Sequence, residues 1–316
     1  MDPASETGHA SLDRFTARTR RTVRYTKRML LVDASVYIFR AFHSLPSSLT
    51  GAEGRPINAV HGYATFVAGL LAGIDDREVA AAFDESLTRS FRNQLFADYK
   101  ANRETPPQAL VDQIAACREI TEALGMATLS NPVYEADDLI GTLARGADTP
   151  VTIVTSDKDL AQLLGPTDTL WDYARETRYD AAAIEAKFGV PPAAIADYLA
   201  LVGDPVDNIP GVPGIGAKSA AALLGRFGDL DTLLADPAAV AASGLRGAAS
   251  MATRLAEHAD SARLSRRLAT IVTDVDLDAG QRDICRRPAD HERLDAVCRR
   301  VGLGNRLRSR LGLVAA

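Results

Sequence analysis

Three short runs of apolar or β-branched residues, each followed closely by an aspartate, place the strongest constraint on how this chain folds. They are residues 30–32 before Asp33, residues 79–83 before Asp84, and residues 151–155 before Asp157. Such runs are typical of strands buried on both faces of a parallel sheet. Between them, residues 59–73 and 109–124 carry apolar side chains at helical spacing. The alternation predicts an α/β fold with a central, largely parallel sheet flanked by helices.

Acidic residues gather where such a sheet would place a functional site. In open α/β sheets, ligands bind beyond the carboxyl ends of the strands. The full candidate set is Asp33, Asp84, Glu135, Asp137, Asp138, Asp157, Asp159, Asp204 and Asp207. Singly, each acid has a structural explanation, at a helix N-terminus or in a turn. Together they would repel one another strongly unless cations bind among them.

The ligand types indicate which cations these would be. Oxygen-only ligands favour Mg²⁺ or Mn²⁺ over zinc. Two such ions about 4 Å apart activate water and stabilise both the attacking and the leaving oxygen of a phosphoryl displacement. The acids therefore predict phosphodiester hydrolysis.

A basic segment follows the second strand. Residues 89–103 place Arg92, Lys100 and Arg103 around Tyr99. Cations of this kind neutralise phosphate charge in a transition state, and an aromatic ring stacks on an unpaired base. Spacing alone favours the alternative, a solvated amphipathic helix.

A glycine-rich turn, residues 211–219, leads into an alanine-rich helix. Its candidate DNA-binding residues are Gly211, Gly214, Gly216, Lys218 and Ser219. Backbone N–H groups at a helix N-terminus hold phosphate without sequence preference. The pattern is neither a dinucleotide fingerprint nor a P-loop, and the alternative is a simple turn at a helix end.

Composition limits the class of protein. The net charge of −5 is not typical of a nucleic-acid binder, although a carboxylate cluster lowers the total without touching a DNA-facing side. Three cysteines argue against a disulfide framework and a zinc site, and favour a reducing compartment. No apolar run approaches the roughly 20 residues that span a membrane, and no signal peptide is evident. We expect a soluble, monomeric, cytoplasmic protein.

In their order along the chain, these segments resemble the 5′-nuclease family. The family includes the nuclease domain of bacterial DNA polymerase I, phage 5′-exonucleases and flap endonucleases. The segments that carry the resemblance are residues 31–46, 83–84, 98–103, 135–138, 156–160 and 203–220. They span nearly the whole chain from Met29, and one local departure is the pair Pro205 and Val206 where small polar residues are more usual.

The resemblance implies a PIN-like fold and a role for each candidate residue. All nine acids would hold two or more Mg²⁺ or Mn²⁺ ions. Lys100 and Arg103 would be catalytic, on a helical arch, with Tyr99 stacking on a base and Arg40 as a weaker substrate contact. The turn at 211–219 would belong to a helix-hairpin-helix that grips duplex DNA and binds a monovalent cation such as K⁺.

Composition along the chain, together with the resemblance, also divides it into parts. Residues 1–28 are expected to be a disordered basic tail, since they carry few large apolar side chains. Residues 29–190 would form the α/β nuclease domain, with the helical arch at about 85–115. Residues 191–316 would form a helical domain with the helix-hairpin-helix and a C-terminal helix. Because the sequence stops soon after this module, we expect a stand-alone enzyme.

The expected function is that of a 5′-3′ exonuclease and 5′-flap endonuclease that acts on DNA in replication and repair, including RNA-primed 5′ ends. One alternative is a ribonuclease on a related acidic core, which would cleave RNA equally well or better. Another is a non-catalytic protein that binds DNA junctions, whose binding would survive replacement of Asp157 and Asp159 by Asn.

Overall fold

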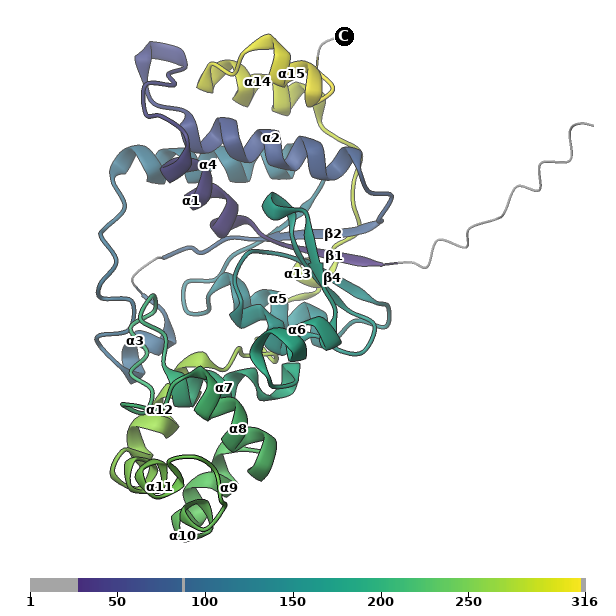
Figure 1. The fold of residues 1–316 in the computed structure, drawn as a ribbon. Coiled ribbons are helices and arrows are strands. Elements are labelled where there is room, and N and C mark those ends of the chain that lie inside the picture. Colours follow the sequence, from purple (N-terminus) through teal and green to yellow (C-terminus); the bar gives the residue numbers. More distant parts are fainter. Residues whose placement is uncertain (1–27, 87–88, 314–316) are drawn as a thin grey trace, which may run out of the picture.

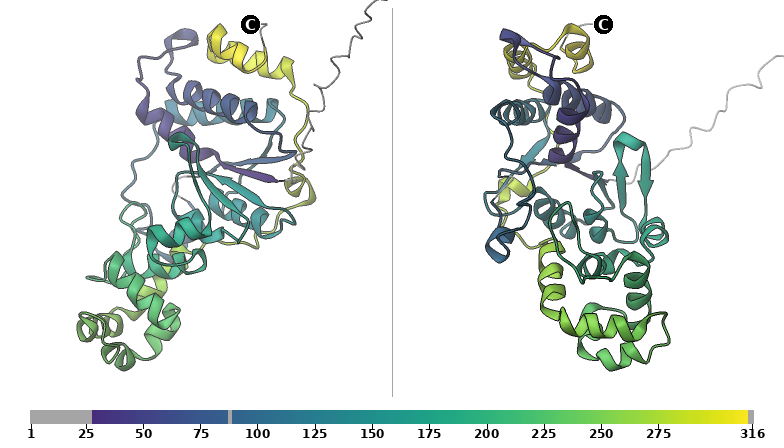
Figure 2. Two further views of the ribbon diagram at one scale, coloured as in Figure 1. Left: turned by 45° about the vertical axis from the view of Figure 1, so that its right-hand side comes forward. Right: turned by 60° about the vertical axis from the view of Figure 1, so that its left-hand side comes forward.

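The computed structural model describes residues 28–86 and 89–313 (Figure 1). The predicted tail, residues 1–28, lies outside the described residues except for its last residue. A layered α/β unit carries an elongated helical region at one end, and this shape is evident in two further views (Figure 2). Within the described residues, no helix is both long and apolar enough to cross a bilayer.

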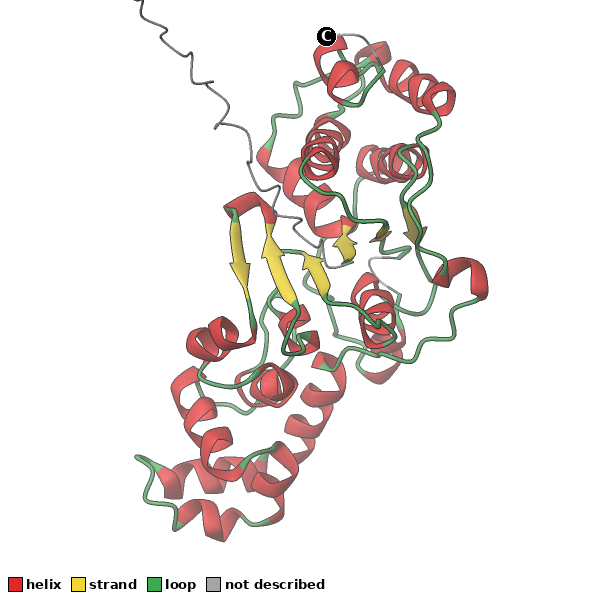
Figure 3. Ribbon diagram, turned by 90° about the vertical axis from the view of Figure 1, so that its right-hand side faces the viewer, coloured by secondary structure: helices red, strands yellow, loops and turns green. Residues whose placement is uncertain are grey.

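A six-stranded sheet forms the centre, in the order β3-β2-β1-β4-β5-β6 (Figure 3). The strands are β1 (Met29–Asp33), β2 (Glu78–Ala82), β3 (Ala127–Leu129), β4 (Val151–Val154), β5 (Thr169–Asp172) and β6 (Thr177–Tyr179). All neighbouring pairs are parallel except β5 and β6. The three strands predicted from the sequence are therefore neighbours, β2-β1-β4, and their carboxyl ends lie together.

Helices cover both faces of the sheet because the strands are apolar on both. Leu30 and Val32 pack into one buried cluster with α1 (Ala34–Ser44), α2 (Asn58–Ala72) and α4 (Gln108–Ala123). Leu31, which points the opposite way, packs into a second cluster with α5 (Ala136–Arg145). The predicted α/β architecture is confirmed.

The helical region continues the second of these clusters. Its helices are α6 (Ala181–Phe188), α7 (Ile195–Val202), α8 (Ala217–Phe227), α9 (Leu230–Ala235), α10 (Pro237–Ala241), α11 (Ala248–Glu257) and α12 (Ala259–Ala269). The 3₁₀ turn η4 (Pro192–Ala194) lies between α6 and α7, whereas η1 (Ala52–Gly54), η2 (Asp159–Leu163) and η3 (Tyr173–Arg175) come earlier in the chain. Leu139 of α5, Leu199 of α7 and Leu223 of α8 belong to one buried cluster, so the sheet and the helical region share a core.

The C-terminal segment returns to the sheet, which changes the predicted division of the chain. Beyond α13 (Ala279–Arg282), the Val79 N–H donates to the Ile284 carbonyl at 3.0 Å, alongside β2. Then α14 (His291–Val301) packs on α4, and α15 (Asn305–Arg310) packs on α2 (Figure 1). Leu294 and Val297 are buried in the cluster of α2 and α4. Residues 191–316 thus do not form a single helical unit.

Among its described residues, 85–86 and 89–115, the segment predicted as a helical arch contains little helix before α4. It holds α3 (Phe91–Leu95), a series of turns through residue 103, and an extended stretch that ends where α4 begins. Pro106 and Pro107 prevent helix from continuing through this stretch, and Lys100 adopts a left-handed conformation with φ of 56°. The expected arch is therefore corrected to a short helix followed by turns.

Candidate active site

Asp33 joins the ends of two central strands. It is the last residue of β1 and the N-cap of α1, where its Oδ1 accepts a hydrogen bond from the Val36 N–H at 3.2 Å. Its Oδ2 accepts from the Thr155 hydroxyl, which follows β4, at 2.8 Å. The side chain is buried, and its position is fixed from both strands.

Asp84 follows β2 and connects it to the first turns of two helices. Its N–H donates to Ser35 Oγ at 2.9 Å, and its Oδ1 accepts from the Ala136 N–H at 2.9 Å. The second bond brings the N-terminus of α5 to the same edge of the sheet. Asp137, in the first turn of α5, is thereby placed beside the strand-end acids.

A cleft with a cavity volume of about 660 Å³ opens over this edge. Its charged lining consists of Asp33, Asp84, Glu135, Asp137, Asp157, Lys100, Arg103 and Glu104. One wall is apolar and includes Phe39 and Phe42 of α1 and Leu110 of α4. The structure therefore brings five of the nine predicted acids and both predicted catalytic cations to one cavity.

Crowding of the acids raises their proton affinity. Burial, together with the charge of Asp84, raises the pKa of Asp33 from its ordinary 3.8 to about 7. Burial and neighbouring carboxylates raise the pKa of Asp137 and of Asp159 well above the ordinary range. Burial also raises the pKa of Asp84 and of Asp157. A group of carboxylates in this state gains from any cation that enters it.

Two cations reach the acids from the turns that follow α3. Lys100 Nζ lies 2.7 Å from Glu135 Oε1 and 3.6 Å from Asp207 Oδ2. Arg103 lies 2.5 Å from Asp207 Oδ1. Burial lowers the pKa of Lys100, but the charge of Glu135 and its neighbours outweighs this and raises it well above the ordinary value. Lys100 therefore remains charged in the site.

Two further acids, Asp204 and Asp159, gather around Lys158. Its Nζ lies 2.5 Å from Asp204 Oδ2 and 3.8 Å from Asp159 Oδ1. Asp157 Oδ1 accepts from the Asp159 N–H at 2.9 Å, which holds this second group against the first. Of the predicted metal-binding acids, five line the cleft, Asp159 and Asp204 form this adjoining group, and Asp207 pairs with Lys100 and Arg103.

The donor set fits a hard cation. Asp159 Oδ1 is buried and has no hydrogen-bond partner, and a carboxylate oxygen of this kind is the donor that Mg²⁺ or Mn²⁺ binds. In the part of the chain that the structure describes, no three His, Cys, Asp or Glu side chains converge closely enough to surround an ion. Here Lys100, Arg103 and Lys158 pair with the carboxylates instead.

Two predicted roles do not match the positions in the structure. Asp138 has no exposed surface, and both its oxygens accept from the Arg92 guanidinium, at 2.7 and 2.8 Å, rather than facing the cleft. Tyr99 is 3% exposed. Its hydroxyl donates to Glu135 at 3.0 Å, so its ring is not available to stack on a base. Arg40 is exposed on α1 outside the lining of the cleft, and its contact with the substrate stays a prediction.

The glycine-rich turn lies between α7 and α8. Gly211 has a φ of 65°, and a Cβ on it would lie 2.4 Å from the Gly203 nitrogen. A Cβ on Gly214, with φ of 80°, would collide with Arg254. Gly216 is the N-cap of α8, which no side chain caps, and Lys218 is exposed in the first turn. The turn requires glycine at 211 and 214, and it leaves backbone N–H groups available.

Sequence reasoning missed several residues that shape the site. Asn102 donates to the Pro205 carbonyl at 2.9 Å, and Asn208 donates to the Asp98 carbonyl at 2.7 Å. These bonds fasten the turns that carry Lys100 onto the loop of Asp204 and Asp207. No periodicity marks such long-range pairs; only the turn-forming types of Asn102 and Asn208 hint at them.

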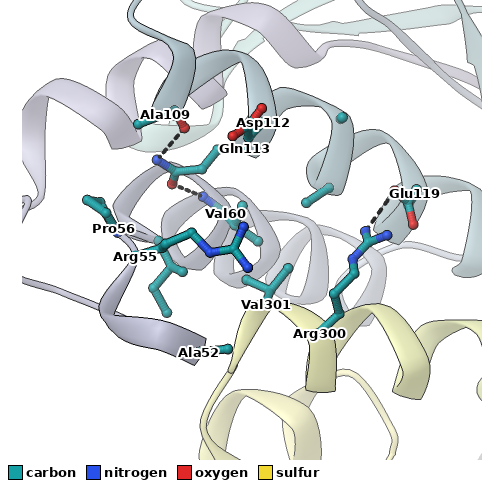
Figure 4. A pocket seen from close by; sticks show the side chains of 13 residues that line it. Ala52, Arg55, Pro56, Val60, Ala109, Asp112, Gln113, Glu119, Arg300 and Val301 are labelled. Atoms are coloured by element: carbon teal, nitrogen blue, oxygen red, sulfur yellow. Dashed lines mark hydrogen bonds and ion pairs between the residues drawn. The ribbon is translucent and has the colours of Figure 1, made fainter.

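A second cavity, of about 420 Å³, lies on the other side of α4, against α2 and α14 (Figure 4). Its two arginines are already paired: Arg300 lies 2.7 Å from Glu119 Oε1, and Arg55 lies 2.6 Å from Glu53 Oε2. Gln113 donates to the Ala109 carbonyl and accepts from Val60 (Figure 4). Nothing in this lining resembles the acid cluster of the cleft.

Known proteins share this architecture. The N-terminal, resolvase-like domain of 5′-3′ exonucleases matches residues 28–189, and their C-terminal SAM-fold domain matches residues 190–292. A 5′-3′ exonuclease of Streptomyces coelicolor is 35% identical over 315 residues, which cover 91% of this chain and 100% of that protein. DNA polymerase I of Pseudomonas aeruginosa is 45% identical over 254 residues, covering 79% of this chain. The chain spans about a quarter of the length of such polymerases.

Solved structures show the same fold. The T5 5′-exonuclease with bound zinc ions superposes with a TM-score of 0.65 at 18% identity, covering 90% of this chain and 97% of that one. The catalytic core of Rad2 in complex with a DNA substrate gives a TM-score of 0.61 at 18% identity, covering 92% of each chain. Together with the two domain matches, these relatives establish that the chain belongs to the 5′-3′ exonuclease family.

Proposed function

We propose that this protein hydrolyses phosphodiester bonds of DNA with a free 5′ end or a 5′ flap, using two or more Mg²⁺ or Mn²⁺ ions. The observation that carries the proposal is the cleft, where strand-end carboxylates and the cations of Lys100 and Arg103 line one cavity. Crowded acids favour divalent ions, and fixed cations stabilise a phosphate in its transition state.

The side chains divide into two roles. Asp33, Asp84, Asp137 and Asp157 would hold ions in the cleft. Asp159 and Asp204 beside Lys158, and Asp207 beside Lys100 and Arg103, would complete the set. Such ions supply Lewis acidity and a nucleophilic water when bound. Glu135 and Asp138 would orient the site, because their oxygens accept from Lys100 and Arg92.

Lys100 and Arg103 would act on the scissile phosphate. They approach the cleft from the turns after α3, and the carboxylates of Glu135 and Asp207 hold them there. Donors that are positioned before the reaction do not have to reorganise during it. The apolar wall of the cleft, which includes Phe39 and Phe42, excludes water beside them.

DNA is the substrate that the relatives favour. A T5 flap endonuclease was solved in a pseudo-enzyme-product complex with DNA and metal ions, and Rad2 was solved with a DNA substrate. In this chain, the uncapped N-terminus of α8 with exposed Lys218 would hold the duplex backbone through N–H groups and charge. Cleavage of 5′ flaps and RNA-primed ends, a K⁺ ion at the turn, a monomeric state and a cytoplasmic location are further parts of the proposal.

A cleavage assay tests the proposal. End-labelled 5′-flap DNA is incubated with the protein and Mg²⁺ or Mn²⁺, beside EDTA and beside the double variant Asp157→Asn, Asp159→Asn. We expect cleavage near the flap base that requires the metal and is abolished in the variant. The matched control is Asp148→Asn, an exposed carboxylate before the amino end of β4, which should cleave like the wild type.

Other outcomes select the alternatives. A wild-type protein that binds the flap but never cuts it is a junction-binding protein, and the catalytic proposal fails. Equal or faster cleavage of an all-RNA flap of the same geometry indicates a ribonuclease.

A further inference from the structure

Arg92 is a buried charge that connects three separate parts of the chain. Its side chain is 3% exposed and extends from α3. Nε donates to the Leu268 carbonyl at 2.8 Å, and Nη2 donates to the Thr270 carbonyl at 3.0 Å. Towards α5, Nη1 and Nη2 bind Asp138 at 2.7 and 2.8 Å, and Nη1 lies 3.1 Å from Glu135. These bonds use all five N–H donors of a guanidinium.

The acceptors on the far side are the end of a helix. Leu268 lies in the last turn of α12, and Thr270 is its C-cap. Carbonyls at a helix C-terminus lack partners within the helix and carry partial negative charge. The Arg92 guanidinium satisfies two of them, so it binds the end of α12 as a capping group would.

Asp138 completes the connection from the side of the acid cluster. Its Oδ1 also accepts from the Val272 N–H at 2.9 Å, just beyond α12. Its Oδ2 accepts from the Glu135 N–H at 3.1 Å, which fixes the first turn of α5 and with it Asp137. A nearby hydrogen bond, from Gln162 Nε2 to the Ala269 carbonyl at 3.0 Å, ties the end of α12 to η2, whose first residue is Asp159.

The far end of α12 holds the glycine-rich turn. Ser265 Oγ accepts from the Gly211 N–H at 2.9 Å, and the Ser261 hydroxyl donates to the Gly211 carbonyl at 2.8 Å. Helix α12 therefore contacts the turn proposed to grip the duplex, and its C-terminal end is held by the pair Arg92 and Asp138, which we call the clamp. The clamp in turn contacts Glu135 of the acid cluster.

We propose that Arg92 is a positioning residue that fixes α12, and hence the duplex-gripping turn, relative to the acid cluster, and so sets the position at which DNA is cut. This inference rests on the proposed nuclease function. A buried ion pair often adds little stability compared with apolar side chains of similar size, whereas such pairs can specify a unique arrangement. Arg92 binds the end of α12 on one side and Asp138 of α5 on the other, which fits a role in specifying how these two helices are arranged.

The test uses the full chain with Arg92→Lys. Lysine keeps the charge but cannot bind Asp138 in a bidentate manner and also reach both carbonyls. On a 5′-labelled flap resolved to single nucleotides, we expect the cut to spread to neighbouring positions. The single-turnover rate should fall on the order of 100-fold, as a misplacement of about 1 Å produces. The Kd for flap DNA should change little.

A control variant is available on α12, the helix whose end Arg92 binds. Arg266 of α12 binds Asp231 in a bidentate manner at 2.9 Å, within the helical region and away from the acids. Arg266→Lys makes the same substitution in a bidentate ion pair whose side chains are more exposed, and we expect it to keep one cut position and a nearly unchanged rate. A single cut position in Arg92→Lys, or equal spreading in both variants, would overturn the inference.

Amide hydrogen exchange gives a readout that does not need cleavage. We expect Arg92→Lys to lose protection at Val272 and in the first turn of α5, with other helices unaffected. If wild type fails to cut but this pattern appears, the proposed nuclease function fails while the clamp stands. Unchanged exchange at Val272 shows that Arg92 does not hold these parts together. If Arg92→Lys fails to fold, the pair Arg92→Leu, Asp138→Leu removes both charges, and the same cut-position and exchange criteria apply to it.

Discussion

The cavities on the two sides of α4 differ in how their charges are balanced. In the second cavity, each arginine has one acidic partner, and the paired side chains are well exposed. In the cleft, six carboxylates line the cavity beside only two cations, Lys100 and Arg103, and burial raises the pKa of several of these acids. Both cavities are large enough for a ligand. Only the cleft holds charge that a divalent ion would relieve, and this imbalance marks it as the functional site.

The largest expected difference between the cavities is in catalysis. Lys100→Ala removes a cation that we propose acts on the scissile phosphate, so cleavage should fall on the order of 10² to 10³-fold. Arg300→Ala removes a cation from the second cavity and should leave the rate within about twofold. Single-turnover cleavage of flap DNA measures both. Equal losses in the two variants would end the distinction between the cavities.

Divalent ions should stabilise the protein through the cleft. At a concentration about 100 times the Kd, Mn²⁺ is expected to add about 2.7 kcal/mol to the free energy of unfolding, because it binds only the folded state. The measurement is a thermal melt with Mn²⁺ against EDTA. The Asp157→Asn, Asp159→Asn variant should show a smaller increase, whereas Glu119→Gln in the second cavity should behave like wild type.

Asp33 should make the metal-free protein less stable at neutral pH. Its folded pKa of about 7 exceeds the ordinary 3.8, so the folded state binds the proton more tightly. The free energy of unfolding therefore falls as pH rises from about 4 to 7, since the unfolded chain releases this proton first. Asp33→Asn should add on the order of 2 kcal/mol at pH 8 and almost nothing at pH 4. Urea unfolding in EDTA measures this, with Asp148→Asn as the control.

The smallest effect is expected in the second cavity. Glu119→Gln breaks the exposed pair with Arg300, which should change the free energy of unfolding by less than about 1 kcal/mol. High salt should reduce the difference further, because ions screen exposed charges. A change of several kcal/mol in urea unfolding would show that this cavity carries a strained or buried charge after all.

Local sequence patterns predicted the scaffold and most of the acids. Apolar runs at 30–32, 79–83 and 151–155 require burial on both faces, and a parallel sheet then places Asp33, Asp84 and Asp157 at one edge. The sequence also predicted the turn that contains Gly211 and Gly214. Both residues adopt a positive φ, which disfavours most other residue types.

Residues whose role depends on distant partners could not be assigned from the sequence. Asp138 appears in the sequence as one more acid, yet Arg92 occupies both its oxygens. Tyr99 appears exposed among basic residues, but the fold buries its ring and directs its hydroxyl to Glu135. Likewise, the C-terminal helices α14 and α15 cross back to α4 and α2, although their sequence shows only amphipathic helix.

The sequence by itself therefore determined the three central strands β2, β1 and β4 and the aspartates that follow their apolar runs, because burial and backbone geometry act on neighbouring residues. The tertiary structure alone decided which acids face the cleft, which are bound by arginine, and how α12 is fixed to α5. The bonds from Arg92 to Leu268 and Thr270 join residues 176 and 178 positions apart. Pairings of that kind exist only once the chain has folded and brought those groups within hydrogen-bond distance.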